Sequence, residues 1–230
     1  MSEGPTERDQ PSPRVRTRDA AATKARILKA AKAEFARHGL GGARVDTIAA
    51  RAQANKRMLY HYFGSKEALF RAVLEAAYLD IRQAEQRLGL DALEPEAAMD
   101  ALVTFTWNYY LRNPEFLRLV NSENLHRAKH LRQLPTVREA FPPFVAMVRS
   151  ILDRGVAKGV FRPGIDAVQL NLTIAAISYY YLTNRFTGAY LYDRDMMGEA
   201  ALAERLAFNL ETVRRLLRAE SGRASPPPPA

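Results

Sequence analysis

The chain of 230 residues lacks cysteine, a long apolar run and the alternating pattern of β-strands. Without cysteine it can form neither a disulfide framework nor a site that uses thiolates as metal ligands or nucleophiles. The longest apolar stretch, residues 168–182, is interrupted by polar side chains and is shorter than the roughly 20 residues of a membrane-spanning helix. The N-terminus is charged and has no apolar signal core. These absences predict a soluble, cytoplasmic protein with no membrane partner.

The missing strand pattern leaves helices as the expected elements. Apolar residues recur every three or four positions along most of the chain, which is the spacing of amphipathic helices. The sequence therefore predicts an all-α fold of about nine helices. Among them are helices over about residues 23–38, with Thr23 as N-cap, 114–127 and 166–187.

Composition divides the chain into four parts. Residues 1–20 are predicted to be a disordered basic arm and residues 219–230 a disordered proline-rich tail. Between them, residues 21–66 predict a small three-helix domain and residues 67–218 a larger helical domain. Residues 1–66 hold fourteen Lys and Arg against six Asp and Glu, whereas the rest holds twenty against nineteen. This asymmetry favours a polyanionic partner for the first part, although a merely solvated basic surface would look the same.

Two short helices joined by a brief turn are predicted within residues 45–64, and this arrangement is a helix-turn-helix. The first helix covers about residues 45–52. Asn55 is a good N-cap for the second helix, Gly64 ends it, and Ser65 can cap the helix that follows.

The second of these helices is expected to bury one face and expose the other. Leu59 and Phe63 lie four residues apart on one face, while Arg57 and His61 lie on the opposite side. A helix of this kind fits the major groove of DNA, where base edges present a readable pattern of donors and acceptors. Arg, Lys and Tyr at its edges can bind phosphate oxygens, which fix the register of the protein on DNA.

Residues 23–70 resemble the DNA-binding domain of TetR-family transcriptional regulators. Three segments carry the resemblance: ILKAAKAEFARHG, VDTIAARA and NKRMLYHYFGSKEALF. By matching position, the resemblance implies DNA contact by ten residues: Arg44, Thr47, Asn55, Lys56, Arg57, Met58, Tyr60, His61, Tyr62 and Lys66. Arg57 and Met58 fall where family members often touch bases, and most of the others fall where they touch phosphates. For the two tyrosines, simple packing on the bundle is the alternative.

The resemblance also implies a function and shows two departures from the family pattern. In this family, the all-helical C-terminal domain binds a small molecule and dimerises, and ligand binding usually releases DNA. The predicted function is a ligand-responsive regulator, a repressor that binds palindromic double-stranded operator DNA as a homodimer and is no enzyme. Gln53 and Ala54 stand where the family often has glycine and a larger apolar residue. Arg57 and Met58 replace a frequent Gly-Thr pair, which indicates an operator preference of its own.

The dimer interface is predicted from two helices near the C-terminus. The helix over residues 166–187 is apolar on nearly all sides, so we expect it to be buried all round. The last helix carries one apolar stripe of Leu202, Leu206, Leu210, Val213 and Leu217. Together they suit a four-helix interface with two helices from each subunit. Packing within a single chain is the alternative.

Candidate effector-binding residues come from the larger domain, because small-molecule sites combine apolar walls with a few polar groups. Aromatic residues at helical spacing can equally be plain core. The candidates are Trp107, Asn108, Tyr110, Asn124, His126, His130, Tyr180 and Asn184.

Glu123, His126 and His130 are spaced to lie on one helix face. Such a face can be simply polar, can contact a ligand, or can hold a divalent metal. The last option would suit an all-α metal-dependent enzyme, but that function leaves the basic first third unexplained. A non-specific architectural DNA-binding protein is a further alternative, against which the large, nearly neutral second domain argues. No cofactor is expected.

Overall fold

The computed structural model describes residues 13–219, with side chains from Asp19 onward. Within this range the predicted all-α fold is confirmed, and the one β pairing is an isolated bridge between Phe161 and Arg218. No helix of the described part is long and apolar enough to cross a membrane. The helices are α1 Pro13–Gly42, α2 Val45–Arg51, α3 Lys56–Phe63, α4 Lys66–Gln86, α5 Pro95–Arg112, α6 Pro114–Leu125, α7 Pro135–Glu139, α8 Phe141–Ala157, α9 Ala167–Thr183, α10 Arg185–Leu191 and α11 Glu199–Leu217, with short 3₁₀-helices at Leu90–Ala92 and Leu131–Gln133.

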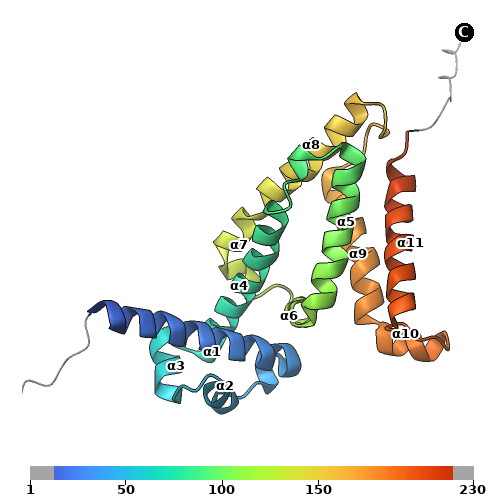
Figure 1. Cartoon of the computed structure of the whole chain (residues 1–230). Helices are drawn as coiled ribbons and strands as arrows, with labels where there is room; N and C mark the ends of the chain where they lie inside the picture. The colour runs from blue at the N-terminus through green and yellow to red at the C-terminus, as the bar shows by residue number, and fades with distance from the viewer. Residues whose placement is uncertain (1–12, 220–230) are drawn as a thin grey trace, which may run out of the picture.

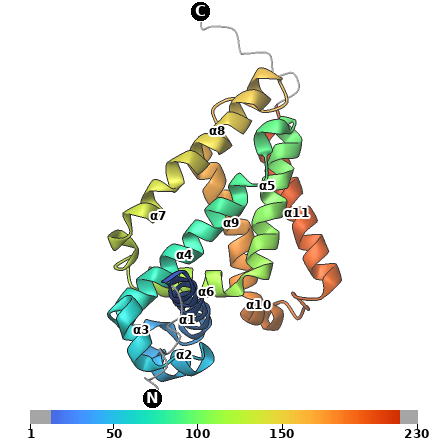
Figure 2. The same cartoon turned by 60° about the vertical axis from the view of Figure 1, so that its left-hand side comes forward.

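The helices form a small bundle and a larger part, joined by one long helix (Figure 1). α1, α2 and α3 make the bundle at one end of the molecule, and α4 runs from the bundle into the larger part. There α5 packs against α8, α9 and α11. In the turned view, α7 and α8 line one side of α4, while α5 and α11 lie on the other (Figure 2).

Two apolar clusters hold these helices together. The first contains Phe35 and Leu59 of the bundle and continues through Phe70 of α4 to Phe116 of α6. The second fills the far half of the larger part, where Val148 of α8 meets residues of α5, α9 and α11. Each large apolar side chain buried in this way contributes about 1.5–3 kcal/mol. The core of the bundle therefore extends across α4 instead of ending where α4 begins.

Local capping signals place the helix boundaries around α3 correctly. Asn55, Ser65 and Asp166 each accept a hydrogen bond from the backbone N–H three residues later, at 2.8, 3.0 and 2.8 Å. These bonds cap α3, α4 and α9. Gly64 ends α3 with a φ of 79°, a conformation that glycine adopts without strain.

The predicted start of the first helix is wrong. α1 begins at Pro13, so residues 13–20, which were expected to be disordered, are helical. Proline is tolerated in a first helical turn, and no helix breaker follows before Gly39, where φ is 64°. Thr23 is no N-cap, because it lies inside α1 with 7% of its surface exposed and accepts a hydrogen bond from Arg26.

Other predicted boundaries differ by less. α6 ends at Leu125, and the positive φ of Arg127 and of Ala128 turns the chain away from the helical conformation. The predicted helix over residues 166–187 is broken at Asn184 into α9 and α10. The remaining parts of the predicted disordered tails, before residue 13 and after residue 219, lie outside the described residues.

Candidate DNA-binding surface and ligand sites

The free face of α3 is the first candidate site. Leu59 is completely buried and fixes the helix against α1, α2 and α4. The side chains of Lys56, Arg57, Tyr60 and His61 are exposed on the remaining surface. Four side chains that can donate hydrogen bonds therefore lie on one side of an eight-residue helix. A single helix that presents such a face can enter a major groove.

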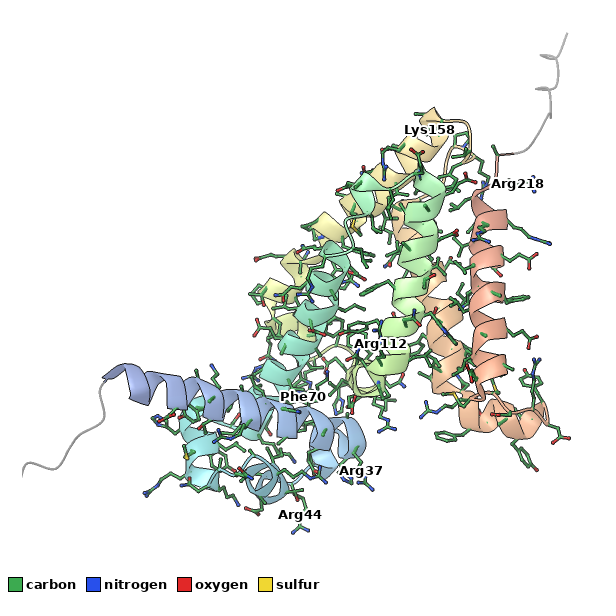
Figure 3. All side chains as sticks on the ribbon, viewed as in Figure 1. Arg37, Arg44, Phe70, Arg112, Lys158 and Arg218 are labelled. Atoms are coloured by element: carbon green, nitrogen blue, oxygen red, sulfur yellow. The ribbon has the colours of Figure 1, made fainter. Side chains whose placement is uncertain are left out.

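The other predicted DNA-binding residues lie around this face. Arg44 and Asn55 are exposed. Figure 3 shows that the Arg44 side chain projects outward from the bundle, away from the rest of the protein. Thr47, Met58 and Tyr62 are half-buried, and Tyr62 packs against the first apolar cluster. The ring of Tyr62 is thus partly a core residue, which was the alternative considered for it.

Two of the candidate lysines already have partners within the protein. Lys56 Nζ lies 3.0 Å from Asp46 Oδ1, and hydrogen bonding to that carboxylate raises the pKa of Lys56. Lys66 Nζ donates to the carbonyl oxygen of Gly41 at 3.3 Å. The pair of Lys56 and Asp46 is exposed to solvent, and such pairs add little to stability. Lys56 can therefore exchange Asp46 for a phosphate.

Glu34 positions α2, a role that was not predicted from the sequence. Its side chain is buried, one oxygen accepts the backbone N–H of Arg44 at 3.2 Å, and the other accepts from Arg51 Nη1 at 3.2 Å. Arg44 is the N-cap of α2 and Arg51 is its last residue. One buried carboxylate thus holds both ends of α2 against α1. The available signal was a lone acidic residue on the same stripe as Ile27 and Ala31.

The turn between α2 and α3 contains a residue in the left-handed conformation without being glycine. Gln53 has a φ of 50° and an exposed side chain. The backbone N–H of Ala54 still bonds to the carbonyl oxygen of Ala49 at 3.0 Å, so the turn closes in the normal way. The Cβ of Gln53 makes this conformation unfavourable by about 1–2 kcal/mol.

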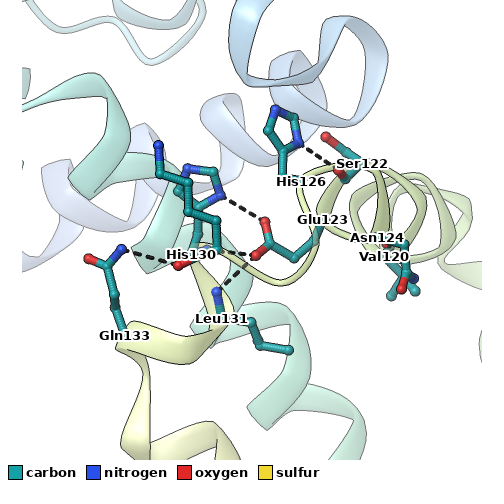
Figure 4. A network of polar contacts seen from close by, with 9 residues as sticks. Val120, Ser122, Glu123, Asn124, His126, His130, Leu131 and Gln133 are labelled. Atoms are coloured by element: carbon teal, nitrogen blue, oxygen red, sulfur yellow. Dashed lines mark hydrogen bonds and ion pairs between the residues drawn. The ribbon is translucent and has the colours of Figure 1, made fainter.

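The predicted polar helix face at Glu123, His126 and His130 is wrong, because α6 ends at Leu125. Glu123 and His130 are buried, and Glu123 Oε2 lies 2.8 Å from His130 Nδ1 (Figure 4). Glu123 Oε1 accepts the backbone N–H groups of His130 and Leu131 at 2.7 and 2.9 Å. Both oxygens of Glu123 are therefore used to close the loop that follows α6.

His126 and Asn124 are exposed and bond to their own helix. His126 Nδ1 lies 2.7 Å from the carbonyl oxygen of Ser122, and Asn124 Nδ2 donates to the carbonyl oxygen of Val120 at 3.0 Å (Figure 4). No group of three or more His, Asp or Glu in the described part of the chain is placed to hold a metal ion. The alternative of a metal site has no support at this position.

Trp107 and Tyr110, predicted as ligand residues, are 1% and 8% exposed members of the first apolar cluster. Trp107 packs edge-on against Tyr181 with 5.7 Å between ring centroids, and Tyr110 stacks on Phe116 at 6.0 Å. Asn108 is half-buried beside them on α5. Plain core packing, the alternative considered, describes Trp107.

A pocket of about 580 Å³ opens between α9, α10 and α11. Tyr180 and Asn184, both predicted ligand residues, line it together with Arg205 and Phe208. The volume lies within the usual range of about 300–1,000 Å³ for small-ligand sites. Tyr180 and Phe208 are 66% and 59% exposed, so the pocket lies on an outer face of the chain.

That outer face is apolar, and the residues that form it differ from those predicted for the dimer interface. Val168, Leu172 and Tyr180 share the exposed side of α9, so α9 is not buried all round in the single chain. The predicted leucine stripe of α11 points the other way, with Val213 and Leu217 buried against α5 and α9. The exposed apolar surface therefore comes from α9 and from the side of α11 that carries Phe208.

A buried charged cluster, which the sequence pattern does not indicate, lies where α4 meets α8. Arg82 Nη2 donates to Glu85 Oε1 at 2.8 Å, and the two side chains are 11% and 3% exposed. The guanidinium carbon lies 4.1 Å from the ring centroid of Phe144 and 4.8 Å from that of Phe141. Burial raises the pKa of Glu85 to about 7 despite the nearby guanidinium, and it lowers the pKa of Arg82.

Three tyrosines lie near this cluster. Burial raises the pKa of Tyr78 and of Tyr110 to about 12. The pKa of Tyr109 is also raised, by burial and because its hydroxyl donates to Asp80 Oδ2 at 2.7 Å. All three phenols are therefore neutral at physiological pH and can act as hydrogen-bond donors.

Two family models match the chain. The model described as "Bacterial regulatory proteins, tetR family" matches residues 27–73, which contain α2, α3 and the adjoining parts of α1 and α4. The model described as "Tetracyclin repressor-like, C-terminal domain" matches residues 95–213, which run from α5 into α11. The two matches together span both parts of the fold.

Named relatives and solved structures agree with these models. The HTH-type transcriptional repressor NicS of Pseudomonas putida is 41% identical over 204 residues, which cover 89% of this chain and 96% of that protein. The HTH-type transcriptional repressor SCO4008 of Streptomyces coelicolor is 38% identical over 161 residues, 70% of this chain and 79% of that protein. The crystal structure of the regulator SCO4942 from Streptomyces coelicolor is 26% identical and covers 86% of this chain and 99% of its own, with a TM-score of 0.64.

Proposed function

This chain belongs to the TetR family of bacterial transcriptional regulators, and from that premise we propose that it is a repressor released from DNA by a small molecule. Both named relatives at 38% identity or more are described as transcriptional repressors, which supports this sign of regulation. A protein that binds operators acts where the chromosome is, so we place it in the cytoplasm and assign it no catalytic activity.

The operator contacts are proposed for the free face of α3 and the residues around it. Arg57 stands at the exposed side opposite Leu59, and a guanidinium there can bind guanine O6 and N7 bidentately. Met58 is proposed as the second base contact. The remaining contacts are proposed to be with phosphates and come from Arg44, Thr47, Asn55, Lys56, Tyr60, His61, Tyr62 and Lys66.

A homodimer is proposed through the exposed apolar face of α9 and α11. Val168, Leu172 and Phe208 are 43–59% exposed, and monomeric proteins rarely leave such a contiguous apolar face uncovered. A two-fold dimer presents its two recognition helices to successive major grooves, about 34–36 Å apart. The operator should therefore be near-palindromic.

Release by an effector follows from linkage between two sites. An effector that favours a subunit arrangement with a different spacing of the α3 helices weakens operator binding. Operator DNA must then weaken effector binding by the same factor. The effector is proposed to bind in the larger part of the chain, which the bundle contacts mainly through α4 and α6.

The observation that carries the proposal is the position of α3: it is anchored by Leu59, capped by Asn55, and exposes its polar side at one end of the molecule. The test is selection of binding sites by the full chain from random duplex DNA at near-physiological salt. We expect a palindrome whose half-sites lie one helical turn, or a multiple of it, apart. Salt-sensitive binding without any enriched sequence would instead indicate a non-specific binder and would overturn the proposal.

A further inference from the structure

Arg82 and Glu85 leave three buried atoms without a hydrogen-bond partner among the described residues. The atoms are Nε and Nη1 of Arg82 and Oε2 of Glu85. A buried polar group left unpaired costs about 1–3 kcal/mol, and a charged one costs more. Folded proteins pair nearly all such groups, so three unpaired buried atoms in one cluster call for a physical explanation.

Around Arg82, the unpaired donors outnumber the one unpaired acceptor, Glu85 Oε2. Glu85 uses one oxygen for Arg82, and the nearby carboxylate of Asp80 accepts the hydroxyl of Tyr109. Tyr78 and Tyr110 add two further neutral phenols close to the guanidinium. One unpaired carboxylate oxygen cannot serve all of these donors, so a further acceptor is needed, and beside an arginine the most favourable acceptor is an anion.

The walls near Arg82 are aromatic. Tyr78 lies 5.5 Å from Phe116 and 6.5 Å from Phe141 between ring centroids, in edge-on and tilted geometry. Phe141 also lies over Arg82, is half-buried, and is the first residue of α8, directly after the break that follows α7. Of the two phenylalanine rings over Arg82, Phe141 is the more exposed. Aromatic walls of this kind favour a flat ligand in offset or edge-to-face contact.

We propose that Arg82 anchors the effector, and that the effector is a small aromatic monocarboxylate whose carboxylate accepts hydrogen bonds from the guanidinium. The ring of the effector lies among Tyr78, Tyr110 and Phe141. A monoanion is preferred because one guanidinium, already shared with Glu85, cannot offset the desolvation of a dianion. The inference depends on the proposed function only in calling the bound molecule an effector.

Glu85 makes the binding depend on pH. The groups that face it are Arg82 on its own helix and Tyr109 and Tyr110 on α5, while α8 contributes only phenyl rings near Arg82. A bound carboxylate repels the ionised form of Glu85, so binding should be accompanied by proton uptake. Affinity should then fall as pH rises through neutrality, and a Glu85→Gln variant should lose this dependence.

The test is calorimetric titration of the full chain, without DNA, with benzoate and a set of other monocyclic aromatic carboxylates, each paired with its neutral amide. We expect at least one carboxylate to bind at least about tenfold more tightly than its amide. Arg82→Gln should weaken that binding about tenfold or more. Arg87→Gln, at an exposed arginine just past the end of α4, is the matched control and should bind as the wild type does.

A second variant keeps the test decisive if Arg82→Gln alone disturbs folding. Arg82→Met combined with Glu85→Leu removes both buried charges, and apolar replacements of similar volume are often as stable as the original buried pair. We expect this double variant to unfold at or above the wild-type temperature and to bind no carboxylate.

Three outcomes would overturn the inference. They are equal binding of carboxylate and amide, unchanged carboxylate binding by the folded double variant, and no binding of any carboxylate up to about 10 mM. The last outcome would leave water as the partner of Arg82. Because the titration contains no DNA, none of these results affects the operator selection, and failure of that selection leaves the titration valid.

Discussion

The bundle and the larger part differ in how completely their buried polar side chains are hydrogen-bonded. In the bundle, the buried Glu34 uses both oxygens, one at each end of α2. In the larger part, Arg82, Glu85, Arg154, Arg205 and Asn209 each keep at least one buried atom unpaired, and no such atom occurs in the described part of the bundle. The same chain therefore satisfies its polar groups fully in one region and incompletely in the other.

This difference matches what each region is proposed to do. A surface that reads base edges must hold its donors in one geometry, so every internal bond that fixes α2 and α3 contributes to specificity. A region that takes up a small molecule gains affinity when the ligand pairs groups that were unpaired before. Incomplete pairing near Arg82 is thus a disadvantage for folding and an advantage for binding.

Removal of Glu34 should give the largest loss of stability. Glu34→Ala leaves the N–H of Arg44 without its buried partner and frees Arg51, which should cost about 3 kcal/mol of unfolding free energy. Urea denaturation followed by circular dichroism measures this loss. Asp46→Ala, which removes an exposed pair, is the control and should cost much less than Glu34→Ala. Equal losses for the two variants would contradict the rigid role of Glu34.

The free energy of unfolding should depend on pH because of Glu85 in the unpaired cluster. The pKa of Glu85 is raised from 4.5 to about 7 on folding, chiefly by burial, so the folded state binds this proton more tightly than the unfolded state. Its contribution to stability is full below the unfolded pKa and is lost as pH rises through 7. Between about pH 5 and pH 8 the wild type should lose about 2–3 kcal/mol relative to Glu85→Gln. Parallel stability curves for the two proteins would show that Glu85 does not titrate in this range.

The reading surface should lose specificity when Arg57 is truncated. Arg57→Ala should lower discrimination between the selected operator and unrelated DNA by about 1–3 kcal/mol while keeping salt-sensitive general binding. Lys56→Ala is the comparison, since loss of a phosphate contact should weaken binding to all sequences about equally. Competition binding with operator and scrambled duplexes separates the two effects. Unchanged discrimination in Arg57→Ala would place the base contacts elsewhere.

The smallest expected effect tests strain in the turn of the bundle. Gln53→Gly removes the Cβ from a residue with a φ of 50° and should stabilise the protein by about 1 kcal/mol. Gln53→Ala keeps the Cβ and should change little. Thermal unfolding of the three proteins measures the difference. A gain in Gln53→Ala as large as in Gln53→Gly would mean that the side chain, and not the backbone conformation, carries the strain.

The sequence predicted those features that depend on neighbouring residues. Asn55, Gly64 and Ser65 mark the ends of α3 and the start of α4 through local hydrogen bonds and a positive φ, and each was placed correctly. The end of α6 was missed, because Arg127 and Ala128 adopt positive φ without any glycine to indicate it. The loop holds them there through Glu123 and His130, a pairing that sequence spacing alone misread as a helix face.

Features that depend on packing between distant segments were not predictable in this way. Nothing local distinguishes Arg82 from the exposed arginines of the chain, because its burial results from α8 closing over α4. The leucine stripe of α11 was assigned to the wrong partner for the same reason, since periodicity identifies an apolar face and not the surface that covers it. The candidate DNA-binding residues could be placed on one surface because α3 is short and its anchor, Leu59, is unambiguous.

The length of α4 has a mechanical consequence. Phe70, near the start of α4, is buried with the bundle, and Arg82, near its end, lies in the larger part. One unbroken helix is therefore packed into both regions. Twelve residues of α-helix span about 18 Å. A tilt of about 5° at the Arg82 end therefore displaces the Phe70 end by about 1.6 Å. In the proposed two-fold dimer, the two displacements would combine at the DNA. With the effector proposed beside Arg82, α4 would act as a rigid lever that transmits a small displacement at the ligand to the whole DNA-binding bundle.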